Sequence, residues 1–185
     1  MERLKIFISS VQRDLEEERD AAEAVVGQFG HDCLRAESHD SPGATPKATC
    51  EQMATECDIY VGIFGGTYGS QDPSIGMSIT EFEYRKAHAC DPGKVFVYVK
   101  DVDSVEAEQE RFLREVQDFA TGYFRHGKFN DCGELAEQLH RDVTTWTTQR
   151  IRQARSSERE NMALLDKMAY YRRVMKEYGI PEELQ

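Results

Sequence analysis

Two short segments that are almost entirely apolar constrain the fold most strongly. They are residues 58–64 (DIYVGIF) and residues 94–100 (KVFVYVK). A parallel strand that helices cover on both faces is apolar along its whole length, whereas a strand with one face in water alternates between apolar and polar residues. A third segment of this kind, residues 4–9, lies near the start of the chain. We therefore expect three buried strands in one parallel sheet.

Helical patterns and two weaker strands fill the sequence around these segments. Apolar residues recur at helical spacing from Ser10 to Phe29, which predicts a first helix directly after the first strand. Further helices are expected at residues 46–56, 78–90, 104–120 and 133–149, and weaker strands at residues 32–37 and 123–129. Strands that alternate with helices in this way predict an α/β, flavodoxin-like parallel sheet of five strands in the order 2-1-3-4-5, with helices on both faces.

The C-terminal part differs in charge from the rest, which divides the chain into an α/β domain at residues 1–150 and a helical extension at residues 151–185. The extension carries nearly equal numbers of basic and acidic residues, whereas the rest is strongly acidic. Its apolar residues follow a heptad spacing at Leu164, Met168, Tyr171, Met175 and Tyr178. We expect this stripe to dock on its own domain or on a neighbouring copy, or else to link the domain to a partner.

Composition excludes several classes of function. A net charge of −11 and a pI of about 5.0 argue against direct binding to nucleic acid or to an anionic membrane. Charged residues appear at once at the N-terminus and no long apolar segment follows, so neither export nor membrane insertion is expected. The five cysteines form no CxxC pair; they are Cys33, Cys50, Cys57, Cys90 and Cys132. We expect reduced thiols in the cytoplasm, without a metal site or a disulfide framework.

Polar residues follow the first strand, at the edge of the sheet where ligands bind in open α/β folds. Ser9 and Ser10 are expected to leave this strand and to open the first helix. Their hydroxyls and the free backbone N–H groups of the helix then suit a phosphate or a ribose oxygen. Ordinary helix capping is the alternative. His39, in the loop after the second strand, is expected at the same edge, either against substrate or in solvent.

A glycine-rich turn, GGTYGS, follows the third strand. Gly65, Gly66 and Gly69 allow a ligand to approach the backbone, and Tyr68 is a candidate to stack on a base. The alternative is a turn that only requires positive φ angles. The segment matches neither the phosphate-binding loop of NTPases nor the glycine fingerprint of dinucleotide-binding folds.

Two glutamates in the segment SITEFEY have different expected roles. Ser78 and Glu81 have the spacing of a capping box, which gives Glu81 a structural role at the start of a helix. Glu83 lies about 200° around the helix from Glu81, on the stripe that faces the sheet. Because burying a carboxylate is unfavourable unless the group is paired or used, Glu83 is the candidate functional acid. A salt bridge to Arg13 or to another arginine is the alternative.

Several of these motifs together resemble the domain-of-unknown-function 4062 family. They are FISS at residues 7–10, RDL at 13–15, ERD at 18–20, GTYG at 66–69 and SITEFEY at 78–84. This family is similar to Toll/interleukin-1 receptor (TIR) domains and to nucleoside 2-deoxyribosyltransferases, and its members often stand at the N-terminus of large proteins in bacterial immunity-like systems. Ser78, Thr80 and Glu83 match the Ser-x-Thr-x-x-Glu pattern of the deoxyribosyltransferases, which implies that Glu83 is the catalytic carboxylate, with Glu81 as second choice.

The resemblance implies an effector that cleaves the N-glycosidic bond of NAD or a related nucleotide, with NAD as substrate and no cofactor. It further implies a role in prokaryotic antiviral defence and activation by assembly, as a homo-oligomer or with a sensor protein. Substrate contacts are then expected from Ser9, Ser10, Arg13, His39, Gly65, Gly66, Tyr68, Gly69 and Ser78. The alternatives are a non-catalytic scaffold that self-associates or docks on a sensor, and a nucleoside-processing transferase of metabolism.

Overall fold

The computed structural model describes residues 3–36, 45–118, 120–123 and 127–177. The chain divides into two compact units, residues 1–140 and 141–185. The elements are β1 (Lys5–Ser10), α1 (Glu16–Gln28), β2 (Asp32–Leu34), α2 (Pro46–Glu56), β3 (Ile59–Phe64), β4 (Gln71–Asp72), β5 (Met77–Ser78), α3 (Ile79–Cys90), the 3-10 helix η2 (Pro92–Lys94), β6 (Val95–Val99), α4 (Ala107–Val116) and α5 (Cys132–Glu177). The first unit has three layers, helices on both faces of a sheet, and the described part of the second unit belongs to α5.

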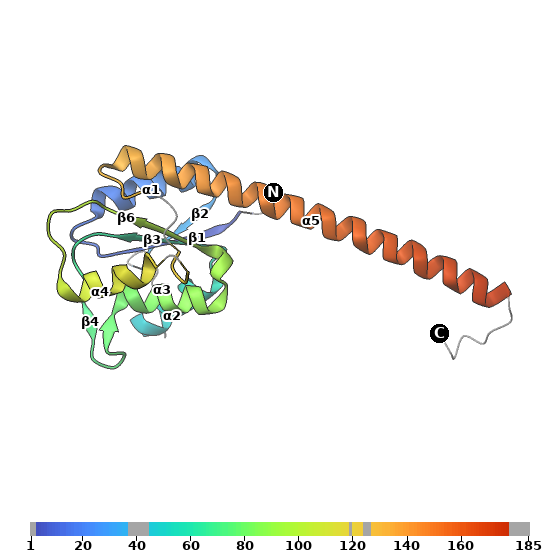
Figure 1. The fold of residues 1–185 in the computed structure, drawn as a ribbon, viewed down its shortest axis with the longest axis horizontal. Coiled ribbons are helices and arrows are strands. Elements are labelled where there is room, and N and C mark those ends of the chain that lie inside the picture. Colours follow the sequence, from blue (N-terminus) through green and yellow to red (C-terminus); the bar gives the residue numbers. More distant parts are fainter. Residues whose placement is uncertain (1–2, 37–44, 119, 124–126, 178–185) are drawn as a thin grey trace. The chain divides into compact units, whose positions relative to one another are not determined.

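A parallel sheet in the order β2-β1-β3-β6 forms the centre of the first unit. Figure 1 shows α1 and the first turns of α5 on one face of this sheet, and α2, α3 and α4 on the other. The flavodoxin-like α/β prediction is therefore confirmed. β4 and β5 form a separate antiparallel hairpin just before α3.

One hydrophobic cluster lies between the sheet and helices α2, α3 and α4, and buried apolar residues of α1 and α5 pack in the first unit as well. Every residue of β3 is buried, as expected for a central strand between two helical layers. The ring of Phe64 packs edge-to-face against Tyr84 of α3 and Phe112 of α4. These aromatic contacts fix α3 over the carboxyl ends of the central strands.

The sheet of the described residues has four strands, whereas five were predicted, with the fifth at residues 123–129. Within the described part of residues 123–129, only Phe129 pairs with the sheet, through a parallel bridge to Lys100. The Phe129 N–H donates to the carbonyl of Val99, at 3.0 Å, and its carbonyl accepts from Asp101 N–H, at 2.8 Å. The sequence of this segment, YFRHGKF, has polar residues and one glycine at its centre, so it lacks the apolar run that would extend the bridge into a strand.

The first helix begins later than expected. Ser9 and Ser10 are the last residues of β1, where they pair with Gly62 and Ile63, and helix α1 starts at Glu16. Ladder hydrogen bonds to β3 hold both serines extended, whereas the acidic first turn of α1 suits a helix N-terminus. The second strand is also shorter than expected, because β2 ends at Leu34.

The C-terminal helices form one continuous helix, α5, where separate segments were expected. Several large apolar side chains are exposed in its second part: Met162, Leu164, Leu165, Met168, Tyr170 and Tyr171. Three members of the heptad stripe, Leu164, Met168 and Tyr171, are therefore exposed, while Tyr178 lies outside the described residues.

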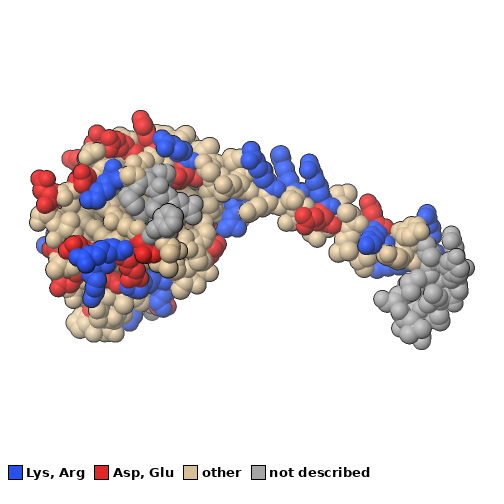
Figure 2. All heavy atoms as spheres, in the orientation of Figure 1, with Lys and Arg blue, Asp and Glu red and all other residues tan. Residues whose placement is uncertain are grey.

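Charges of both signs cover the face of the first unit that Figure 2 presents, where Lys and Arg lie among Asp and Glu. Ion pairs within the first unit join Lys100 to Glu18, at 2.5 Å, and Arg35 to Asp20, at 2.7 Å. No helix among the described residues has both the length and the apolarity needed to cross a membrane.

A glycine substitution tests the packing after β3. A Cβ added to Gly66 would lie 2.2 Å from the backbone oxygen of Ser104, which leaves no room for a side chain. Gly66→Ala is expected to lower the free energy of unfolding by roughly 1–3 kcal/mol, as overpacked sites do. Gly27→Ala, in α1, is the control: open space surrounds its Cβ position, and alanine favours the helix by up to about 1 kcal/mol. Urea titration of both variants measures the difference, and equal stability would contradict the packing.

Candidate functional site

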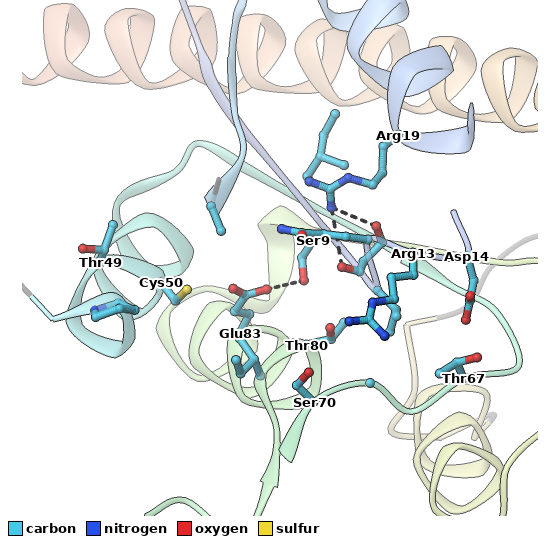
Figure 3. Close-up of a pocket in the computed structure, with 18 of the residues that line it drawn as sticks. Ser9, Arg13, Asp14, Arg19, Thr49, Cys50, Thr67, Ser70, Thr80 and Glu83 are labelled. Carbon is cyan, nitrogen blue, oxygen red and sulfur yellow. Dashed lines mark hydrogen bonds between the residues drawn. The ribbon is translucent and has the colours of Figure 1, made fainter. Parts of the chain in front are cut away.

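A cavity of about 1110 Å³ opens at the carboxyl end of β1. Its walls come from β1, the turn before α1, the start of α2, the GTYGS loop and the first turns of α3. They comprise Ile8, Ser9, Ser10, Val11, Gln12, Arg13, Asp14, Arg19, Ala36, Pro46, Thr49, Cys50, Thr67, Gly69, Ser70, Ile79, Thr80, Glu83 and Glu106. Figure 3 shows the labelled polar side chains around this space, with Ser9 and Glu83 turned toward one another. The cavity lies where open α/β sheets bind ligands.

Glu83 is a buried carboxylate in the wall of this cavity, with 4% of its surface exposed. Its Oε2 accepts a hydrogen bond from the hydroxyl of Ser9, at 2.6 Å (Figure 3). The local sequence fixes this position, because Ser78 caps α3 by accepting from the N–H of Glu81, at 3.1 Å. The helical register then turns Glu83 toward β1.

Glu81 belongs to a different network and is not among the cavity-lining residues. Its Oε2 accepts from the hydroxyl of Tyr68, and its Oε1 accepts from Nε of Arg85, at 2.8 Å. Arg85 also binds the carboxylate of Glu115 on α4, at 2.8 and 3.0 Å. This arrangement ties the GTYGS loop, α3 and α4 together, so Glu81 has a structural role, whereas Glu83 lines the cavity.

The thiol of Cys50 and the hydroxyl of Tyr60 both lie near Glu83. Burial, the negative charge of Glu83 and a hydrogen bond to Glu83 together raise the pKa of Cys50 to about 12, with burial as the largest cause. Burial also raises the pKa of Tyr60 well above its ordinary value, again with Glu83 as the next cause. Both groups are therefore neutral near pH 7 and add no negative charge beside Glu83.

A buried arginine, Arg19, also lines the cavity. Its side chain is 4% exposed, and Nη1 donates to the hydroxyl of Ser10, at 2.9 Å, and to the Ser10 carbonyl, at 3.5 Å. The predicted position of Ser10 at a helix N-terminus is therefore wrong, since Ser10 ends β1 and its hydroxyl accepts a hydrogen bond from Arg19. Arg13 comes from the turn before α1 and points into the cavity beside Thr80 (Figure 3).

The glycine turn contributes less to the cavity than the sequence predicts. Gly69, with φ of 86°, lines the cavity, whereas Gly65 and Gly66 pack against Leu15 and Ser104. Tyr68 is 3% exposed, so its ring is not available to stack on a ligand. The turn therefore exposes backbone atoms, and not the Tyr68 ring, to the cavity.

The remaining predicted residues fall outside the cavity or outside the description. Ser78 is buried at the N-cap of α3 and does not line the cavity. His39 lies outside the described residues. No group of histidine, cysteine and carboxylate side chains suited to a metal ion occurs among the residues that the structure describes.

Sequence reasoning missed Arg19 and Cys50. Arg19 carried a signal, because it lies on the apolar stripe of α1 with Leu15 and Ala22, where a charged residue is unusual. Cys50 carried none, since a buried cysteine in an amphipathic helix is ordinary core.

Fold and site together define an α/β protein of flavodoxin-like topology with a buried carboxylate in a cavity at the strand ends. The sequence profile of the family Domain of unknown function (DUF4062) matches residues 5–144. The chain therefore belongs to this family, as the motifs at residues 7–10, 66–69 and 78–84 predict. No curated protein sequence matches the chain. A crystal structure of the RPS4 and RRS1 TIR domain heterodimer is similar over 78% of this chain and 98% of that chain, with 15% identity and a TM-score of 0.45.

Alkylation of Cys50 tests whether the charge of Glu83 acts at this site. Removing that charge in Glu83→Gln is expected to lower the raised pKa of Cys50, and thus to increase its thiolate fraction at pH 8. Iodoacetamide should then modify Cys50 roughly three to ten times faster, because one pKa unit changes the thiolate fraction about tenfold. Peptide mass spectrometry measures the rate. Glu81→Gln is the matched control, with little change expected, and an unchanged rate in Glu83→Gln would contradict the placement of the two groups.

Proposed function

We propose that this protein cleaves the N-glycosidic bond of NAD or a related nucleotide, with Glu83 as the catalytic carboxylate. The observation that carries the proposal is the burial of Glu83 in the wall of a large polar cavity, with its Oε2 held by the Ser9 hydroxyl at 2.6 Å. A carboxylate withdrawn from water interacts strongly with a positive charge that develops beside it.

The proposed reaction needs only one such group. Heterolysis of the bond between C1′ and the nicotinamide nitrogen sends the bonding electrons to the pyridinium ring, which leaves as neutral nicotinamide. Positive charge then develops on the sugar as an oxocarbenium-like centre, which Glu83 stabilises or traps as an ester. Water adds at C1′ and releases one proton, which yields ADP-ribose. A second, proton-donating carboxylate is not required, because the leaving ring needs no proton.

The neighbours of Glu83 suit this role. Ser9 is a positioning residue, since its hydroxyl donates a hydrogen bond that fixes one oxygen of the carboxylate. Cys50 stays protonated below a pKa of about 12, so it adds no second negative charge beside the carboxylate. The site then holds a single anionic group where the sugar charge develops.

The proposed setting is an effector of prokaryotic antiviral defence in the cytoplasm, active when assembled with further copies or with a sensor protein. Membership of the DUF4062 family and the resemblance of its motifs to TIR domains support this setting. The free cysteines among the described residues fit a reducing compartment.

Release of nicotinamide tests the proposal. Concentrated protein incubated with NAD is expected to release nicotinamide, detected by chromatography. Glu83→Gln should lower the rate at least about 100-fold, the usual effect of removing a group that stabilises transition-state charge. Glu81→Gln is the matched control, a second buried glutamate on the same helix, and should keep most of the activity while melting at a lower temperature.

Three other outcomes would overturn parts of the proposal. If Glu83→Gln keeps the activity and Glu81→Gln loses it, with both folds intact by circular dichroism, the catalytic carboxylate is Glu81 and the assignment of Glu83 is wrong. Base exchange that requires an added acceptor base would identify a transferase. No release at any concentration would favour a scaffold.

The scaffold is the second candidate function, and the exposed apolar side chains of α5 favour it. Leu164 and Leu165 are 56% and 63% exposed, although leucine usually lies inside a protein. A second copy of the helix is the proposed occupant of this surface, because the heptad spacing suits a coiled-coil partner.

Light scattering tests this surface. The protein is expected to exceed the mass of one chain at high concentration, and Leu164→Glu should shift it toward the monomer, because a charge in a coiled-coil seam is unfavourable. Glu158→Gln on the same helix is the control. A monomer at every concentration would remove self-association from both candidate functions.

A further inference from the structure

We propose that Tyr60 is a positioning residue of the candidate site: its buried hydroxyl orients the hydroxyl of Ser9, which in turn holds the carboxylate of Glu83. Tyr60 does not line the cavity, so it acts through Ser9 and not on a ligand. The inference rests on the proposed function for the role of Glu83, and it goes beyond that function by assigning a residue behind the cavity wall.

The hydroxyl of Tyr60 is a polar group inside a hydrophobic cluster. Tyr60 is fully buried, and within the described part of the chain its hydroxyl has no hydrogen-bond partner of full geometry. A buried tyrosine hydroxyl usually has a partner, because an unpaired one loses its hydrogen bonds to water without compensation. Phenylalanine would fill the same space without that loss. Packing therefore does not explain the hydroxyl, whereas an acceptor close to it would.

Gly62 lets the Tyr60 ring reach the candidate site. A Cβ at Gly62 would lie 3.1 Å from Cε1 of Tyr60, so the ring lies over the glycine, toward the carboxyl end of β3. Gly62 pairs with Ser9 of β1. Their positions share the face of the sheet that α3 covers, since Tyr60 packs edge-to-face on Tyr84 with ring centroids 6.4 Å apart. The ring therefore leans toward Ser9.

The electrostatics of Tyr60 agree with this placement. Burial, as the largest cause, and the charge of Glu83 raise the pKa of Tyr60 well above its ordinary value, whereas hydrogen bonding with Ser9 lowers it. The effect of Ser9 requires a short distance, so the two hydroxyls are neighbours, although their contact falls short of full hydrogen-bond geometry. Because the phenol keeps its proton at neutral pH, Tyr60 is a donor at this place.

The three groups can then form a chain of hydrogen bonds with one direction. The Ser9 hydroxyl donates its only proton to Oε2 of Glu83, at 2.6 Å (Figure 3), and its oxygen retains lone pairs that accept. Donation from Tyr60 to these lone pairs opposes rotation of the Ser9 hydroxyl away from Glu83, and each bond of such a chain strengthens the next. The carboxylate oxygen is thereby held in place, as a group that stabilises transition-state charge requires.

A double-mutant cycle in urea tests this contact without relying on activity. Tyr60→Phe is expected to lower the urea midpoint, because Ser9 loses its donor, although the substitution also removes a polar group from the core. Once Ser9→Ala has removed the acceptor, the same substitution should leave the midpoint unchanged or raise it. Circular dichroism verifies the fold of each variant.

Tyr98→Phe is the matched control for the cycle. Tyr98 is also fully buried, but it pairs with Ile63 and so lies on the opposite face of the sheet from Gly62. Its substitution should therefore change the midpoint equally with and without Ser9→Ala. A higher midpoint for Tyr60→Phe alone, or an equal effect of Tyr60→Phe in both backgrounds, would show that Tyr60 does not act through Ser9.

Nicotinamide release measures the consequence for the reaction. Tyr60→Phe should lower kcat by roughly two- to tenfold, the effect of one net hydrogen bond, and leave KM nearly unchanged, because Tyr60 touches no substrate. Tyr98→Phe should change neither constant. An unchanged kcat for Tyr60→Phe would overturn the positioning role. A positive cycle in a wild-type protein that releases no nicotinamide would instead uphold the contact and overturn the proposed reaction.

Discussion

The hydrogen bond from Ser9 to Glu83 joins the end of β1 to the first turns of α3, and the candidate site is arranged around it. It connects residues 74 positions apart in the sequence and lies in the wall of the cavity. A buried carboxylate requires such a partner, because leaving it unpaired in the interior is unfavourable by several kcal/mol. The bond therefore holds α3 at the sheet edge and keeps the carboxylate oriented toward the cavity.

The helical cover of the sheet makes that geometry stiff. Phe64, at the end of β3, packs against rings from α3 and α4, so the carboxyl ends of the strands and the start of α3 move as one unit. Glu81 strengthens the same region through Tyr68 and Arg85. Two glutamates two residues apart thus divide their roles, because about 200° of helix rotation separates their side chains.

Charged side chains of both signs line the cavity. Glu83 comes from α3, Arg13 from the segment between β1 and α1, and Arg19 from α1. Three separate parts of the chain therefore meet around this space, and the proposed reaction uses the carboxylate that is buried among them.

The sequence by itself determined the buried parallel strands, the cap of α3 by Ser78 and the turn of Glu83 toward the sheet, because these follow from local patterns of apolar residues and helix geometry. Only the tertiary structure decided that the Ser10 hydroxyl accepts a hydrogen bond from Arg19 and that Tyr68 is buried with its hydroxyl bonded to Glu81. Such contacts join residues on different elements, and local spacing carries no information on which polar side chains meet once the helices pack on the sheet.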